Sequence, residues 1–138
     1  MSNSLSSLQA IEIASLIVTT IYHQWASDRD RKSLLPPGKL VTTPDGNVRH
    51  LDLRGSGDLT VIIDASLGGV EGYLLIDELA KLTKVCIYDR AGYGWSQSSF
   101  APRTSQQIVN ELHELLTVTQ ISPPYILVGD SFGSYNLR

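Results

Sequence analysis

The chain has 138 residues, of which 42% are hydrophobic and 18% are charged, and its formal net charge is −3. This composition is typical of a globular domain with an apolar core. The acidic balance leaves no basic surface for a phosphate backbone, so we expect no nucleic-acid partner. The single cysteine, Cys86, excludes an internal disulfide framework and a zinc site built from cysteines. It lies in the apolar run "KVCIYD", where we expect a buried and unreactive side chain.

The first part of the chain, residues 1–35, predicts a helix followed by a linker. Apolar residues recur at helical spacing in "SLQAIEIASLIVTTIYHQW", but Glu12 and several hydroxyl groups make the segment more polar than an ordinary membrane span. No Lys or Arg precedes Arg29, so the basic start of a secretory signal is missing. Two interpretations stay open for residues 5–25: an amphipathic helix on the domain or on a membrane surface, or a membrane anchor. The location is accordingly open between the cytoplasm and a membrane, and "SDRDRKSLLPPGK" is predicted to be the linker.

Residues 36–138 alternate between strand and helix patterns. "KLVTT" and "VRHLDLRG" flank the turn signal "PDGN" and predict a β-hairpin. The continuous apolar run "LTVIIDA" predicts a strand that is buried on both faces, as in a parallel sheet. "KVCIYD" and "PPYILVGD" are predicted to be a second and a third apolar strand. We therefore expect an α/β fold with a mostly parallel sheet, an N-terminal hairpin and right-handed crossovers.

Helices are predicted in "GYLLIDELAKL", in "RTSQQIVNELHELLTVT" and from "SFGSYNLR" onward. In the second of these, Thr104 and Gln107 have the spacing of a capping box. Helical periodicity predicts the core-facing residues of the first two helices. They are Leu75, Leu79 and Leu82 in the first, and Ile108, Leu112, Leu115 and Leu116 in the second.

Chemistry is most clearly indicated at Gly129-Asp130-Ser131-Phe132-Gly133, between the third apolar strand and the last predicted helix. In a G-x-S-x-G nucleophile elbow, a tight turn from strand to helix exposes the serine hydroxyl. Gly129 and Gly133 provide the small residues that such a turn requires beside the serine. The helix N-terminus that follows favours negative charge near Ser131. A serine that only caps the helix stays open as an alternative.

Two other loops follow buried strands at the edge of the sheet where ligands bind in α/β folds. The first is "DASLGGV", and the backbone amides of Leu67 in this loop and of Phe132 in the elbow are candidates for an oxyanion hole. The second is "YDRAGYGWS", where we expect Asp89 to cap local amides in a structural role.

The histidines do not indicate a general base. They are His23, His50 and His113, and all three precede Ser131. We expect each of them to be exposed or structural. No metal or organic cofactor is expected, because a serine–histidine–acid mechanism needs neither.

The stretches "PPGKLV", "YDRAGYGWS", "RTSQQIVNELHELL" and "ILVGDSFGS", in this order between about Pro36 and Arg138, resemble the N-terminal half of α/β-hydrolase fold proteins of the esterase- and peptidase-like kind. The resemblance implies Ser131 as nucleophile, the amides of Leu67 and Phe132 as oxyanion donors, and an ester, amide or related acyl substrate. The triad acid and histidine of this family follow the serine along the chain. We therefore expect residues 1–138 to be a fragment truncated just after the elbow, inactive alone and prone to aggregate at an unpaired edge strand.

Three positions depart from the family pattern. Asp130 replaces the usual histidine, Ser134 replaces a glycine, and Ala65-Ser66 replaces a His-Gly or Ala-Gly pair. These departures keep an alternative open: a catalytically dead, hydrolase-like protein that binds a ligand or associates with a membrane. The "GDS" block of SGNH-type lipases is disfavoured, because that block belongs on the first strand of its fold and here follows two strand–helix units.

Overall fold

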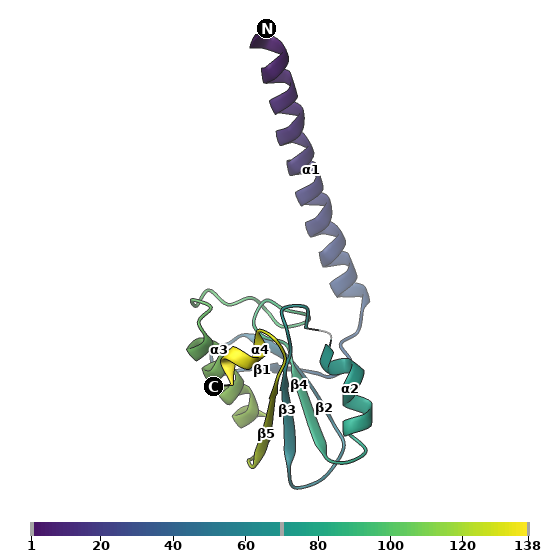
Figure 1. Ribbon diagram of the computed structural model, residues 1–138, viewed down its shortest axis with the longest axis vertical. Coiled ribbons are helices and arrows are strands. Elements are labelled where there is room, and N and C mark those ends of the chain that lie inside the picture. The colour runs from purple at the N-terminus through teal and green to yellow at the C-terminus, as the bar shows by residue number, and fades with distance from the viewer. Residues whose placement is uncertain (1, 70, 138) are drawn as a thin grey trace. The chain divides into compact units, whose positions relative to one another are not determined.

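The computed structural model describes residues 2–69 and 71–137 and divides the chain into two compact units, residues 1–35 and 36–138. The first unit is a single helix, α1 (Ser2–Ser33) (Figure 1). The charged stretch 28–33, predicted as linker, belongs to this helix. None of its Asp, Arg, Lys or Ser residues breaks a helix, and the first proline is Pro36. Among the described residues, no helix combines the length and the apolar character that crossing a membrane requires.

The second unit is built on a five-stranded sheet with the strand order β1-β2-β4-β3-β5. The strands are β1 (Lys39–Thr42), β2 (Val48–Arg54), β3 (Thr60–Asp64), β4 (Lys84–Tyr88) and β5 (Tyr125–Gly129). β1 and β2 form the predicted hairpin, and β3 pairs in parallel with both β4 and β5, as the three apolar runs predicted. β2 pairs antiparallel with β4, so the sheet as a whole is mixed.

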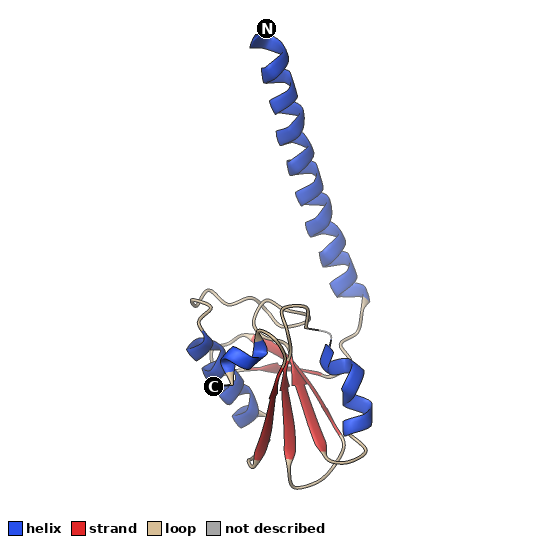
Figure 2. Cartoon of the chain, viewed as in Figure 1, coloured by secondary structure: helices blue, strands red, loops and turns tan. Residues whose placement is uncertain are grey.

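Helices cover both faces of this sheet (Figure 2). They are α2 (Glu71–Leu79), α3 (Ser105–Val118) and the short α4 (Gly133–Asn136). Successive residues of a strand point to opposite faces. Ile62 accordingly packs in a cluster with the apolar face of α3, while Val61 and Ile63 pack with Ile76 of α2. All five residues of β3 are buried, as predicted for a strand covered on both faces.

The predicted core face of α2 is wrong at two of its three positions, whereas Leu79 is partly buried and packs against the core cluster that contains Ile76. Leu75 is 53% exposed, and Leu82 lies beyond the end of the helix and is 81% exposed. The buried residues are Gly72 and Ile76. A Cβ on Gly72 would lie 2.9 Å from Cδ1 of Ile87, so the glycine brings the helix close to the sheet. This close approach fixes the rotation of the helix and directs Leu75 away from the core.

The predicted cap and core face of α3 are confirmed. Oγ1 of Thr104 accepts a hydrogen bond from the Gln107 amide at 3.2 Å, and the four expected apolar residues are buried. Glu111 is buried beside them and forms a two-pronged ion pair with Arg103, at 2.6 and 2.9 Å. The Thr104 amide donates to the Pro102 carbonyl at 2.9 Å, so the second bond of the capping box is not made, and Nε2 of Gln107 donates to Glu111 instead.

β5 is an edge strand, paired only with β3 among the described strands. Its apolar side chains are open to solvent, with Ile126, Leu127 and Val128 exposed at 46%, 49% and 38%. The expected unpaired apolar edge is therefore present. The nucleophile-elbow sequence begins at the carboxyl end of this strand.

Candidate active site

The elbow places Ser131 in a backbone conformation that is unusual for a residue with a side chain. Its φ is +48°, and Gln120 is the only other non-glycine residue with positive φ in the described part of the chain. The left-handed region costs such a residue about 1–2 kcal/mol, and strain of this kind concentrates at functional sites. Ser131 is exposed, and its Oγ makes no hydrogen bond to any described residue. Its hydroxyl is thus presented to solvent at the junction of β5 and α4.

Both elbow glycines lie where a side chain has no room. A Cβ on Gly129 would lie 2.6 Å from the Cα of Ser134. A Cβ on Gly133 would collide with the carbonyl oxygen of Asp64. The turn therefore depends on the absence of side chains at both positions.

The loop with Leu67 and the elbow leave the sheet side by side. Asp64 at the end of β3 is in register with Gly129 at the end of β5, so the two loops begin at the same level of adjacent strands. Among the described residues, neither the Leu67 amide nor the Phe132 amide donates a hydrogen bond. The structure thus brings Leu67, Ser131 and Phe132 to one edge of the sheet with both amides available to a ligand.

A buried arginine that sequence patterns did not indicate links these two loops. Nη1 of Arg90 lies 2.5 Å from Oδ1 of Asp64 and 2.6 Å from the Ala65 carbonyl oxygen, and Nη2 lies 2.6 Å from the Ser66 carbonyl oxygen. Its guanidinium carbon lies 5.2 Å from the centre of the Phe132 ring. The signal in the sequence is a pair of opposite charges, Asp64 and Arg90, at the carboxyl ends of two apolar strands.

Asp64, the last residue of β3, also connects these two loops. Its side chain is fully buried, and Oδ2 accepts a hydrogen bond from Nδ2 of Asn136 in α4 at 2.7 Å. Its carbonyl oxygen accepts the amide of Asp130 at 3.0 Å. One residue at the end of β3 therefore contacts the arginine, the elbow and the helix after it.

Asp89 has the expected capping role and also binds a histidine. Its Oδ2 accepts the Trp95 amide at 3.0 Å and lies 2.9 Å from Nδ1 of His50. Nε2 of His50 accepts the Gly38 amide at 3.1 Å, so the proton of the neutral ring is on Nδ1. His50 is therefore a buried structural residue.

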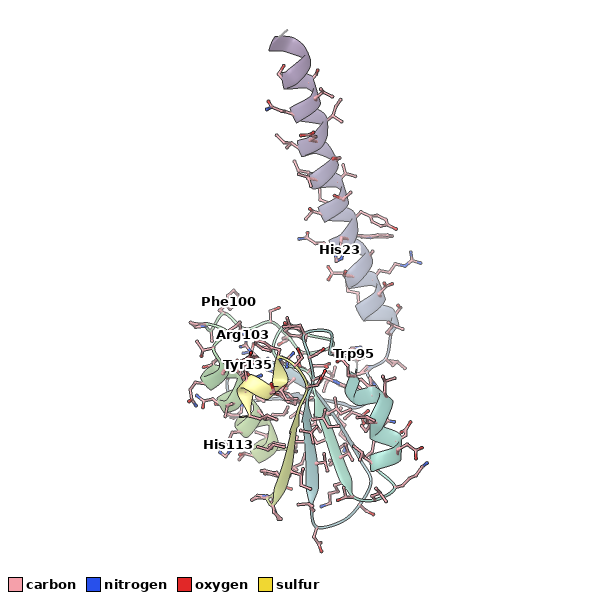
Figure 3. The ribbon with its side chains drawn as sticks, viewed as in Figure 1. His23, Trp95, Phe100, Arg103, His113 and Tyr135 are labelled. Atoms are coloured by element: carbon pink, nitrogen blue, oxygen red, sulfur yellow. The ribbon has the colours of Figure 1, made fainter. Side chains whose placement is uncertain are left out.

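The other two histidines are exposed. His113 projects from the outer side of α3, and His23 lies on α1 (Figure 3). No histidine in the part of the chain that the structure describes forms a hydrogen bond with Ser131. Residues 2–69 and 71–137 thus place no histidine base on Ser131.

Two of the departures from the family pattern have local partners. Oγ of Ser66 accepts the Gly68 amide at 3.0 Å and lies 2.6 Å from Oε1 of Glu71, which holds the turn after β3. Oγ of Ser134 donates to the Ser131 carbonyl at 2.6 Å. Asp130 has an exposed side chain beside the serine. The described residues contain no cluster of three or more metal-binding side chains.

No family model matches the sequence. Protein YqjL of Bacillus subtilis is 37% identical over 95 residues, which are 67% of this chain and 38% of YqjL. Protein YbdG of the same organism is 28% identical over 129 residues, which are 91% of this chain and 39% of YbdG. The chain thus spans less than two fifths of the length of each of these curated relatives.

Solved structures give a consistent result for the fold. An enol-lactonase from Burkholderia xenovorans matches with a TM-score of 0.62 at 22% identity, over 71% of this chain and 39% of that one. An esterase from Exiguobacterium antarcticum matches with a TM-score of 0.61 at 18% identity, over 72% and 38%. An alpha/beta hydrolase from Sphaerobacter thermophilus matches with a TM-score of 0.61 at 23% identity, over 72% and 38%. At these identities the likeness establishes a fold shared with these hydrolases.

Proposed function

We propose that this chain, which has the α/β-hydrolase fold, supplies the nucleophile and the oxyanion donors of a serine hydrolase acting on an ester, amide or related acyl substrate. The observation that carries the proposal is the left-handed backbone of Ser131, with φ +48°, at an exposed turn between β5 and α4. Among the described residues the hydroxyl of this strained serine has no hydrogen-bond partner that would give it a structural role, whereas a nucleophile requires such exposure.

The chemistry follows from the groups around this serine. Oγ of Ser131 attacks the acyl carbon, and negative charge develops on the former carbonyl oxygen. The free amides of Leu67 and Phe132 stabilise that charge, and each such donor is worth about 10²–10³ in rate. A base must remove the serine proton as the bond forms.

We propose that the histidine and the acid of the triad are supplied by residues other than 1–138. His50 is occupied by Asp89 and Gly38, and His113 is exposed on α3. The 138-residue chain alone is therefore expected to be inactive.

A second candidate function is a catalytically dead, hydrolase-like protein that binds a ligand or a membrane. It is favoured by the exposed carboxylate of Asp130 beside the serine, because a negative charge there raises the energy of a nearby oxyanion. Exposed apolar side chains on α1, such as Ile17 and Trp25, favour membrane contact through this helix. The two candidates differ in whether Ser131 is reactive.

A fluorophosphonate probe tests this difference, because it modifies serines that are activated by a base. The polypeptide encoded by the whole open reading frame that contains residues 1–138 is expected to be labelled at Ser131. Ser131→Ala should abolish the labelling, and Ser105→Ala, at the start of α3, should leave it unchanged. The 138-residue chain alone should be labelled at least about 100-fold more slowly. A folded full-length protein without labelling would favour the non-enzymatic function.

A further inference from the structure

Arg90 is a buried cation whose polar contacts converge on one short segment. Its residue exposure is 5%, and its two terminal nitrogens contact Asp64, Ala65 and Ser66, which are consecutive in the chain. The carboxylate of Asp64 neutralises the charge. The two carbonyl contacts are additional, and they hold the backbone of the loop that contains Leu67.

The contact with Ser66 determines the direction of the Leu67 amide. The carbonyl of Ser66 and the N–H of Leu67 belong to the same peptide unit, which is planar and trans. In such a unit the N–H points opposite to the C=O. Because the Ser66 oxygen is bound by Nη2 of Arg90 at 2.6 Å, the Leu67 N–H points away from the arginine. The arginine thus sets the orientation of a donor that it does not touch.

The same guanidinium contacts the second donor residue. It lies over the ring of Phe132, with 5.2 Å between the guanidinium carbon and the ring centre, and over Tyr93 at 4.9 Å. Cation–π contacts of this kind favour a fixed arrangement of the two groups. Phe132 is half-buried, and its amide donates no hydrogen bond to any described residue. One side chain therefore bridges the two residues whose amides are the proposed oxyanion donors.

A lysine cannot replace these contacts. Arginine presents several N–H donors in a planar fork and stacks on aromatic rings, whereas lysine carries a compact charge at the end of a flexible stem. A lysine at this position would retain attraction to Asp64 and lose the simultaneous contacts with Ala65, Ser66 and Phe132.

We infer that Arg90 is a positioning residue that fixes the Leu67 and Phe132 amides relative to one another. The effect of this positioning on catalysis rests on the proposed function. The orientation of the two amides is a property of the fold, and it is measurable whether or not Ser131 reacts.

The test compares Arg90→Lys with Arg103→Lys in the full-length protein. Arg103 is a matched control because it forms a two-pronged ion pair with Glu111 on α3 and, in the described part of the chain, donates no hydrogen bond to residues 64–67 or to Phe132. Two properties are measured: the amide signals of Leu67 and Phe132 in ¹H–¹⁵N spectra, and the rate of fluorophosphonate labelling. We expect Arg90→Lys to shift both amide signals and to slow labelling at least tenfold. We expect Arg103→Lys to lower thermal stability with both amide signals and the labelling rate unchanged.

Unshifted amide signals in folded Arg90→Lys would overturn the inference, and so would a labelling rate within twofold of an active wild type. If the wild type is not labelled, the proposed function fails, and the amide signals alone decide the role of Arg90. Phe132→Leu provides a second variant if Arg90→Lys does not fold. It removes the ring beneath the guanidinium and is expected to shift the Leu67 signal through Arg90. An unmoved Leu67 signal in that variant would count against the coupling.

Discussion

Replacing Gly133 with alanine is expected to force the elbow away from the end of β3. The new Cβ would collide with the carbonyl oxygen of Asp64, a backbone atom of a buried strand that cannot rotate aside. The same oxygen accepts the Asp130 amide at 3.0 Å, so relieving the collision stretches or breaks this hydrogen bond. Overpacking costs about 1–3 kcal/mol, and the hydrogen bond contributes about 1 kcal/mol. The free energy of unfolding should therefore fall by about 2–4 kcal/mol.

Urea unfolding followed by circular dichroism measures this loss. Gly46→Ala is the matched control, because Gly46 has φ +79° and no other atom lies within 4 Å of the place that its new methyl group would take. That variant adds backbone strain without a collision and should cost about 1–2 kcal/mol. If Gly133→Ala unfolds at the same urea concentration as Gly46→Ala or at a higher one, the steric argument for the elbow is refuted.

Three further predictions concern the reactivity of a buried cysteine, the loss of stability at acidic pH and aggregation at the edge of the sheet. Burial raises the pKa of the Cys86 thiol to about 12, so a thiol reagent at neutral pH should modify it only after unfolding; rapid modification of the folded chain would contradict this. Burial alone would raise the pKa of Glu111, but hydrogen bonds from Arg103 and Gln107 outweigh it and hold the pKa below the ordinary 4.5. Its stabilisation is therefore complete above that pH and fades as the pH falls below it, so Glu111→Gln should flatten the dependence of the urea midpoint on pH in this acidic range. Leu127 is 49% exposed on the edge strand, so Leu127→Lys should reduce light scattering by the 138-residue chain with an unchanged thermal midpoint; equal scattering would show that this edge does not drive aggregation.

Local patterns in the sequence were sufficient to predict most of the fold. Continuous apolar runs identified β3, β4 and β5, and the turn signal at 44–47 identified the hairpin. β3 and β4 are covered on both faces and therefore have no polar side, whereas β5 is apolar although its side chains are exposed among the described residues. Leu75 of α2 was wrongly predicted to face the core because Gly72, which has no side chain, lets the helix lie close to Ile87. Helical periodicity predicts which side of a helix is apolar, but it does not predict how closely the helix packs against the sheet.

The site was predictable only in part. The serine and its flanking glycines form a contiguous motif, and the structure gives Ser131 the strained backbone that such a turn requires. Arg90 and Asp64 are separated by 26 positions, and their contact arises because β3 and β4 pair in parallel and end at the same edge. No local sequence pattern predicts that the arginine donates hydrogen bonds to two carbonyl groups of the neighbouring loop.

The order of the strands in the sheet bears on how the chain folds as it is synthesised. β3 lies between β4 and β5, and β5 is separated from it in the sequence by α2, β4 and α3. While the ribosome is still making α3, β3 has a partner on one side only, and its other backbone edge has no strand to bind. Pairing across such a long intervening segment is slow to form, and exposed strand edges invite association with other chains. The elbow thus forms only after β5 has paired with β3, and a newly made chain has to be protected until residues 125–129 emerge.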